Sequence, residues 1–296
     1  MHDGILIIDK PHGLTSHDVI TRIRRVTKVR QVGHAGTLDP MATGVLVVCL
    51  GQATRISEYL FGHDKAYRAT IRLGIETNTY DADGEIVATH EVSIDRAAVE
   101  QALAQFIGEI QQVPPMYSAI KRDGRKLYEL ARHGIEIERA ARSVIVHSIE
   151  LRDYAAPDIT LDVQCSAGTY IRSIAHDLGE ALGTGGHLIE LRRTASGPFT
   201  IDQAISLDEL EKAAAEFQWH TYLRPIDEAL STWPLVVLAE PDRLRALNGA
   251  PIFSLSLSGT HCRAQDERGN LIALLVFDQK KRWWRAEKVL AMNNDD

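Results

Sequence analysis

Cysteine is scarce in this sequence, and long apolar runs are missing from it. The 296 residues include three cysteines, Cys49, Cys165 and Cys262, which lie far apart and form no C-x-x-C pair. This pattern excludes a disulfide framework and a structural zinc site, and a reducing cytoplasm is the expected location. No stretch approaches the ~20 apolar residues of a membrane-spanning helix, and the short, charged N-terminal segment is unlike a secretory signal. We therefore expect no membrane association.

Phosphate-binding loops, metal-ligand clusters, internal repeats and low-complexity tracts are also lacking. The sequence thus gives no sign of a bound metal or cofactor. What it does contain is ordinary globular composition, with 45% hydrophobic and 25% charged residues. This length and composition suit one large domain with a small one beside it.

Basic residues gather in three segments, although the net charge is −7. Residues 10–30 hold six basic side chains against one acid, and "KRDGRKLYELARHG" (residues 121–134) is similarly basic. The segment "KKRWWR" (residues 280–285) adds two tryptophans, a combination suited to phosphates and exposed nucleobases. Any one of these segments would most simply be a solvated face, but the three together favour a nucleic acid partner because local potential decides binding.

Hydrophobic patterning predicts an α+β fold. Apolar or alternating strands are expected over residues 4–9, 44–51, 65–74 and 159–165, and helices over 15–29, 93–110 and from Tyr170 onward. Without regular βαβ alternation, these elements predict a mixed, largely antiparallel central sheet flanked by helices in a domain spanning residues 1–232. From Trp233 the short strands and turns predict a small all-β domain, residues 233–296.

The stretch "GHAGTLDPMATGVLVV" (residues 33–48) surrounds Asp39 with small residues and leads into an apolar strand. An Asp-Pro pair is most often only a turn. Here Gly33 and Gly36 permit close backbone approach, His34 adds a stackable ring, and the following strand would fix the loop to the core. An accessible carboxylate held in this way is suited to act as a nucleophile or general base.

This loop resembles the catalytic loop of the TruB family, the tRNA pseudouridine synthases that isomerise the uridine at position 55 in the T loop. Five further blocks resemble the family, in its order, across residues 4–199: "IDKPHGLTSHDV", "KAYRATIRLGIETNTYDADG", "VPPMYSAIKRDGRKLYELARHG", "CSAGTYIRSIAHDLG" and "GGHLIELRRTASGPF". The resemblance implies the pseudouridine synthase fold. The last sixty or so residues resemble, more loosely, an RNA-binding β-barrel of the PUA type.

Position by position, the resemblance assigns roles to individual residues. It implies that Asp39 is the essential aspartate, that Tyr67 stacks on the target base, and that Arg172 pairs with Asp39, favouring and orienting its charged form. Tyr170 and Leu191 would form pocket walls. The Tyr67 hydroxyl is expected to act through Arg172 or Asp39, because a phenol is a weak base at neutral pH.

Three further substrate contacts are implied. His34 matches the histidine that fills the gap left by the flipped uridine, Lys10 matches a lysine at the rim of the active site, and residues 121–142 match a segment that folds over the RNA. Each residue type also has an ordinary structural use: a tyrosine in an alternating strand is more often core, and a loop histidine is more often simply exposed.

Pseudouridine formation breaks the N1 to C1′ bond and joins C5 to C1′, so no group enters or leaves and no cofactor is implied. The implied partner is the T arm of tRNA, with no obligate protein partner and a monomeric enzyme. A glycosidase would need a second acid near Asp39, where the blocks offer arginine and tyrosine instead. A non-catalytic tRNA-binding and folding chaperone stays open as the alternative, since it needs every feature except an ionised Asp39.

Overall fold

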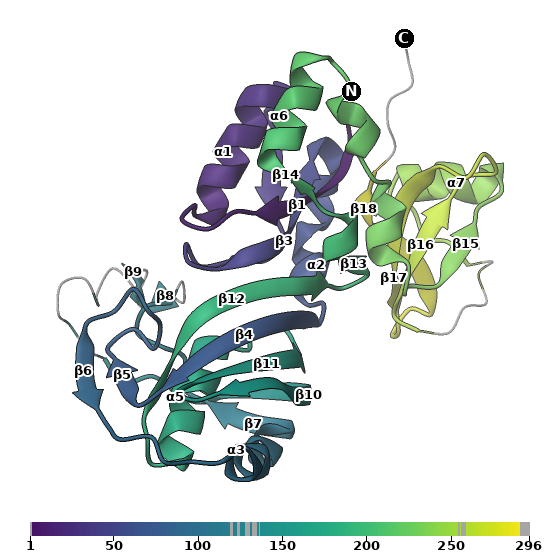
Figure 1. Cartoon of the computed structure of the whole chain (residues 1–296). Coiled ribbons are helices and arrows are strands. Elements are labelled where there is room, and N and C mark those ends of the chain that lie inside the picture. The colour runs from purple at the N-terminus through teal and green to yellow at the C-terminus, as the bar shows by residue number, and fades with distance from the viewer. Residues whose placement is uncertain are drawn as a thin grey trace.

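A large mixed sheet forms the centre of the molecule in the computed structural model of the chain (Figure 1). The structure describes residues 2–118, 121, 122, 125–127, 131, 135, 137–253, 255 and 259–290. Within them the main path of the sheet runs β14-β1-β3-β12-β4-β11-β10-β7. These strands are β1 (Gly4–Lys10), β3 (Thr43–Leu50), β4 (Lys65–Leu73), β7 (Gly108–Gln112), β10 (Arg142–Ala155), β11 (Asp158–Cys165), β12 (Gly186–Ser196) and β14 (Ile205–Ser206). The predicted α+β class is confirmed.

Most neighbouring strands of this sheet are antiparallel. Among the described residues of this sheet, the parallel pairs are β1 with β14 and β12 with β3. β12 lies in the middle, pairing along most of its length with β4 and through two residues with β3. Two short strands branch off the main path: β2 (Val32–His34) pairs with β3, and β13 (Phe199–Thr200) pairs with β12. The sheet therefore joins an N-terminal part, β1 to β3, to a second part, β4 to β11, through β12.

Helices cover the sheet in two groups. α1 (Ser16–Thr27) and α6 (Leu207–Ala215) lie side by side and bury their apolar faces on β1 and β3 (Figure 1). α5 (Ile171–Ala181) and α3 (Arg96–Leu103) pack with β4, β11 and β12. Thr15 begins α1 with a capping box to Asp18, which satisfies first-turn amides and fixes the start of the helix.

Shorter elements complete the large unit. They are α2 (Ser57–Phe61), β5 (Ile75–Thr77), β6 (Ile86–Thr89), β8 (Lys121–Arg122), β9 (Arg125–Lys126) and the 3-10 helices Gly51–Ile56, Ala104–Phe106, Ile201–Gln203, Trp219–Tyr222 and Ile226–Leu230. The helix expected over 93–110 is wrong in its last part. Gly108, with φ of 100°, turns the chain into β7 because glycine adopts this backbone without strain.

A second, four-stranded sheet follows near the C-terminus, as expected: β15 (Leu235–Val237), β16 (His261–Gln265), β17 (Leu271–Asp278) and β18 (Trp283–Val289). Its core packs around Trp284 and includes Ala246 of α7 (Glu240–Leu247), a helix that the patterning did not predict. Leu274 and Leu290 join a cluster with Ile5 of β1, so the two units share apolar contacts. No helix in the described part of the chain has the length and apolar character to cross a membrane.

Candidate active site

Asp39 lies in the loop between β2 and β3, and α1 anchors this loop from below. The hydroxyl of Ser16, in the first turn of α1, accepts a hydrogen bond from the Leu38 amide at 2.9 Å and lies 3.2 Å from the Leu38 carbonyl. The Asp39 carbonyl accepts from the Ala42 amide at 3.1 Å, which closes a turn around Pro40. The carboxylate is thereby held on a short, fixed segment.

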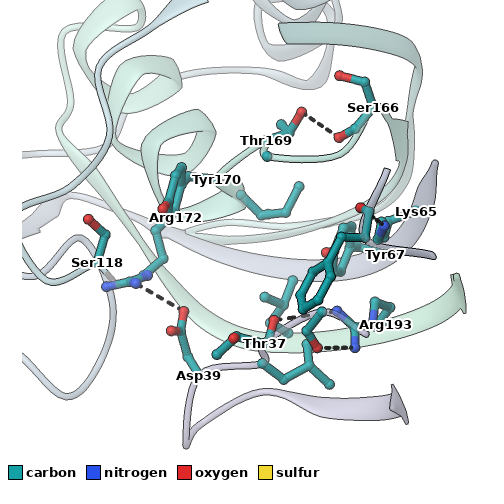
Figure 2. Close-up of a pocket in the computed structure, with 16 residues that line it drawn as sticks. Thr37, Asp39, Lys65, Tyr67, Ser118, Ser166, Thr169, Tyr170, Arg172 and Arg193 are labelled. Carbon is teal, nitrogen blue, oxygen red and sulfur yellow. Dashed lines mark hydrogen bonds and ion pairs between the residues drawn. The ribbon is translucent and has the colours of Figure 1, made fainter. Parts of the chain in front are cut away.

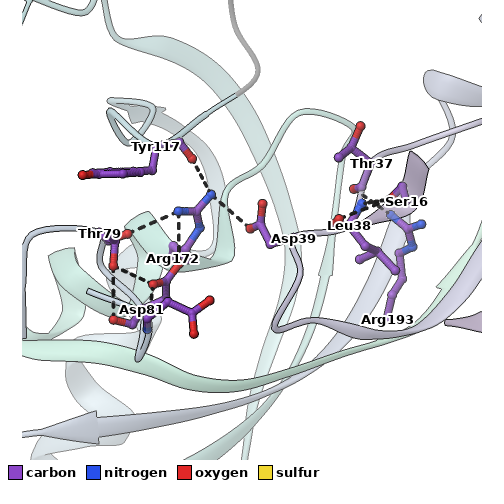
Figure 3. A network of polar contacts seen from close by, with 10 residues as sticks. Ser16, Thr37, Leu38, Asp39, Thr79, Asp81, Tyr117, Arg172 and Arg193 are labelled. Atoms are coloured by element: carbon purple, nitrogen blue, oxygen red, sulfur yellow. Dashed lines mark hydrogen bonds and ion pairs between the residues drawn. The ribbon is translucent and has the colours of Figure 1, made fainter. Parts of the chain in front are cut away.

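Arg172 grips Asp39 from α5, as Figure 3 shows, with 3.0 Å between its Nη2 and the Asp39 Oδ2. The Arg172 side chain is 4% exposed and that of Asp39 36% exposed, so the arginine is buried and the carboxylate faces outward. Nη2 also donates to the Tyr117 carbonyl at 2.8 Å, and Nη1 to the Thr79 carbonyl at 3.3 Å. These bonds fix the guanidinium, and through it the carboxylate.

Asp81 is a second carboxylate on the same arginine, 3.2 Å from its Nη1. The sequence analysis did not single out Asp81 and expected no further acid near Asp39. Burial raises the pKa of Asp81, while the Thr79 hydroxyl, 2.5 Å away, and Arg172 oppose that shift. Asp81 does not line the cavity formed by the described residues. Asp81 holds Arg172 in place from outside the cavity. It is therefore not the second carboxylate that a glycosidase would need opposite Asp39.

A cavity of about 310 Å³ opens beside this pair (Figure 2). It brings together five of the residues that the resemblance singled out, Asp39, Tyr67, Tyr170, Arg172 and Leu191. Leu191 is 8% exposed, and burial raises the pKa of both tyrosine hydroxyls, which keeps them neutral. Asp39 and Arg172 therefore give the cavity a charged side, while Tyr67, Tyr170 and Leu191 give it flat, apolar surfaces suited to a planar ring.

Two cationic residues of the cavity wall escaped the sequence analysis. Arg193 is 1% exposed, and its guanidinium donates to the carbonyls of Gly36 (3.1 Å), Thr37 (3.4 Å) and Val45 (2.6 Å). Lys65 donates to the carbonyls of Phe61 and His63, and burial lowers its pKa to about 8. Both residues lie on strands, at positions that face inward. A charged residue at an inward position of an alternating strand pattern is the signal that could have identified them.

Lys10 lies elsewhere than the resemblance implied. It is fully buried rather than at the rim, and its ammonium donates to the carbonyls of Pro11 (2.9 Å), Leu14 (2.5 Å) and Pro40 (3.2 Å). Burial lowers its pKa to about 8, although the nearby Asp39 opposes this. A lysine enclosed by three carbonyls has no free donor for a phosphate. Through its hydrogen bond to the Pro40 carbonyl, Lys10 is placed to stabilise the loop that carries Asp39.

His34 lies outside the described cavity lining, on β2. Its ring makes an edge contact with Phe61, with 6.4 Å between the ring centroids, and Phe61 lines the cavity with a 45% exposed side chain. Burial lowers the pKa of His34, which favours the neutral imidazole. The ring of His34 therefore lies behind Phe61, in contact with a residue of the cavity lining.

Basic residues of the three segments make more contacts within the protein than the sequence suggested. On α1, Arg22 and Arg25 pair with Glu211 of α6 at 3.1 and 3.5 Å, and Arg24 donates to the Val32 carbonyl. Much of residues 121–134 lies outside the described residues. Near the C-terminus, one tryptophan of residues 280–285 belongs to the core, and Trp283 packs against the Lys281 ammonium, 5.1 Å from its ring centroid.

One group of three potential metal ligands occurs among the described residues: His176, Asp177 and Glu180, on one partly exposed stretch of α5. His176 hydrogen-bonds Asp177 and stacks on Tyr80 at 4.0 Å. The group lies outside the cavity lining and contributes nothing to the geometry at Asp39.

Two family models match the chain. The one described as TruB family pseudouridylate synthase (N terminal domain) covers residues 24–171, and the one described as tRNA pseudouridylate synthase B C-terminal domain covers residues 172–231. A protein named tRNA pseudouridine synthase B from Burkholderia pseudomallei (strain 668) is 47% identical over 94% of this chain and 91% of its own length. Its namesake from Aromatoleum aromaticum is 52% identical over 80% of this chain and 76% of its own.

Solved structures agree with this fold. A chain of the structure described as "Crystal Structure of a Cbf5-Nop10-Gar1 Complex" matches with a TM-score of 0.79 and 28% identity, covering 98% of this chain and 85% of that one. A chain of "Structure of H/ACA RNP bound to a substrate RNA containing 2'-deoxyuridine" matches with a TM-score of 0.76 and 26% identity, covering 98% and 86%. By these matches, the chain belongs to the TruB family of pseudouridylate synthases.

Proposed function

We propose that this protein converts the uridine at position 55 in the T loop of tRNA into pseudouridine, with Asp39 as the nucleophile or base. The curated relatives named tRNA pseudouridine synthase B support tRNA as the substrate class. The observation that carries the proposal is the Asp39–Arg172 pair at 3.0 Å, at the mouth of a cavity with flat apolar walls.

The reaction makes simple demands on such a cavity. The uridine leaves its stack and enters with its ribose near Asp39. The N1 to C1′ bond breaks, the freed uracil turns, and C5 joins C1′; the proton on C5 then leaves and N1 takes one up, so the composition of the RNA is unchanged. An ionised Asp39 assists the exchange at the sugar or the ring, and the walls formed by Tyr67, Tyr170 and Leu191 retain the uracil between the two bonds.

The C-terminal sheet is proposed to extend the RNA contact, as a PUA-like domain spanning residues 233–296. Its support is chemical: Trp283 and Phe253, which is 64% exposed, lie with ring centroids 5.4 Å apart, beside the Lys281 ammonium. Exposed rings beside cations suit unpaired nucleotides. The proposal includes a monomer acting in the cytoplasm without an obligate protein partner.

Incubation of the purified protein with unmodified tRNA, followed by mapping of pseudouridine at each nucleotide, tests the proposal. We expect modification at position 55 and none in a matched transcript that carries cytidine there. Asp39→Asn, which keeps the shape of the side chain and removes its charge, should bind tRNA within about threefold of wild type and yield no pseudouridine. Tight binding without product by the wild-type protein would instead support the chaperone alternative.

A further inference from the structure

Arg193 lies on β12, between the strand that carries Tyr67 and the strand that follows the Asp39 loop. On one side of β12 it is the direct cross-strand partner of Tyr67 on β4, and on the other it pairs with Gly44 at the start of β3. Side chains of direct antiparallel partners lie on the same face, with about 5 Å between their Cβ atoms. The two side chains are therefore neighbours in the cavity wall, as Figure 2 shows.

The backbones of Arg193 and Gly44 approach each other closely. A Cβ on Gly44 would lie 2.2 Å from the Arg193 carbonyl oxygen, and the φ of Gly44 is 97°. Only glycine permits this approach, so Arg193 and the beginning of β3 are in fixed contact. A side chain on such a base is a rigid reference point for whatever it holds.

The guanidinium of Arg193 holds the loop that carries Asp39. Two of its three carbonyl partners, Gly36 and Thr37, belong to this loop, and the third, Val45, belongs to β3. No carboxylate pairs with Arg193 among the residues that the structure describes. Its charge is compensated by carbonyl dipoles and remains available to the neighbouring phenol.

Tyr67 is that phenol. Burial raises its pKa, and the charge of Arg193 is foremost among the influences that oppose this shift. An arginine can only donate, so a hydrogen bond between these two groups uses the Tyr67 oxygen as the acceptor and leaves the phenol proton free. The sequence analysis had expected Arg172 or Asp39 as the partner of this hydroxyl.

We propose that Arg193 is a positioning residue that fixes the Tyr67 hydroxyl and the Asp39 loop relative to each other across the cavity. This inference rests on the proposed pseudouridine synthase activity at Asp39. The Tyr67 hydroxyl and the Asp39 carboxylate must both contact the same nucleoside. A displacement of either group by about 1 Å slows a reaction by roughly 10²-fold. Arg193 acts through these two groups and not on the substrate.

A double-mutant cycle tests the coupling. Single-turnover rates of pseudouridine formation, with enzyme in excess over tRNA, are measured for wild type, Arg193→Lys, Tyr67→Phe and the double variant. We expect Arg193→Lys to slow wild type by about 30-fold or more, and to slow the Tyr67→Phe enzyme by a clearly smaller factor, because there only its hold on the Asp39 loop is left to lose. The affinity for tRNA should stay within about threefold in all four.

The neighbouring residue provides the matched control. Arg192 points away from the cavity and pairs with Asp9 at 2.7 Å, so Arg192→Lys removes the same chemical group from the opposite face. It should leave the single-turnover rate within about twofold of wild type. Thermal unfolding of every variant shows which of them are folded, and Arg193→Gln serves as a second substitution if Arg193→Lys is not.

Two outcomes would overturn the inference while the wild-type enzyme remains active. One is an equal slowing by Arg193→Lys in both backgrounds, which would mean that Arg193 does not act through Tyr67. The other is a wild-type rate for Tyr67→Phe, a result that requires no Arg193 variant to fold. A wild-type protein that forms no pseudouridine would instead refute the proposed function itself.

Discussion

At the scale of single residues, Arg172 is the centre of the polar network around Asp39. Its guanidinium faces two carboxylates and two carbonyls in different directions. Removing such a buried cation entirely would leave Asp81 unpaired in the interior, with a cost in stability of about 3 to 5 kcal/mol. A charge-conserving substitution therefore separates geometry from stability.

Arg172→Lys should slow single-turnover pseudouridine formation by about 10²-fold, because a compact ammonium cannot reach Asp39 and Asp81 at once. The affinity for tRNA should change by less than about threefold, since Arg172 is buried behind the carboxylate. The control is Arg152→Lys, at an exposed arginine that pairs with Asp162 at 3.2 Å. A near-normal rate for Arg172→Lys would mean that the pair with Asp39 has no part in the reaction.

Lys10 predicts a dependence of stability on pH. Its pKa is about 8 in the folded protein, against 10.5 without burial. Between these values the unfolded chain binds more protons, so the free energy of unfolding rises with pH. From pH 8 to 10.5 the wild type should gain about 3 kcal/mol relative to Lys10→Met.

Urea unfolding at several pH values checks this, with Lys212→Met on the exposed face of α6 as the control for loss of a lysine. Parallel stability curves for wild type and Lys10→Met across this range would contradict the assigned burial of the charge.

The local sequence pattern was enough to single out Asp39 as a candidate, whereas the residues that hold Asp39 and its partner Arg172 in place could not be predicted. A carboxylate among glycines before an apolar strand is visible within sixteen letters, and the family blocks added Tyr67 and Arg172. Asp81 and Arg193 act through contacts with residues more than 90 positions away, Arg172 for the first and the Gly36 loop for the second. No local pattern encodes such contacts, so the sequence analysis singled out neither residue.

At the scale of elements, α1 mainly holds the Asp39 loop in place, and it contributes less to a basic surface than its sequence suggested. Its first turn holds Leu38 through Ser16, while its arginines are engaged by α6 and β2. The helix itself was predictable because its cap and apolar spacing are local. Its engagement was not, since Glu211 lies almost two hundred residues away in the sequence.

Ser16→Ala should therefore weaken catalysis from a distance. The variant leaves the buried Leu38 amide and carbonyl without their partner, which should lower the free energy of unfolding by about 1 to 3 kcal/mol. The single-turnover rate should fall while tRNA affinity stays nearly unchanged, because the loop loses its anchor below Asp39. Ser231→Ala, at an exposed site, is the control. A destabilised variant with a wild-type rate would argue that the loop is fixed without α1.

At the scale of the whole molecule, the C-terminal sheet is joined to the large unit by apolar contacts and ion pairs. Besides Leu274 and Leu290 in the shared cluster, Arg263 pairs with Asp227 at 2.7 Å and Lys288 with Glu58 at 2.6 Å. The change of texture near Trp233 indicated a second unit in the sequence. The contacts between the units were not predictable, because both partners of each contact look like ordinary surface or core residues.

Removal of residues 232–296 should lower the melting temperature, since it uncovers the cluster around Ile5. It should also weaken tRNA binding, while the single-turnover rate at saturating enzyme stays within about threefold, because the proposed catalytic residues all precede the cut. Circular dichroism identifies whether the shortened chain is folded. Loss of the chemical step in a folded shortened chain would contradict this division of roles.

The central position of β12 has a consequence for synthesis on the ribosome. β3 and β4 emerge before residue 75, yet they meet only through β12, which is made after residue 185. A nascent chain can thus carry Asp39, Tyr67 and Arg172 while the strand that joins them is still missing. Its open strand edges would invite mispairing during that interval. The order of synthesis therefore delays activity until β12 has been made, and chains that end before this strand should be inert.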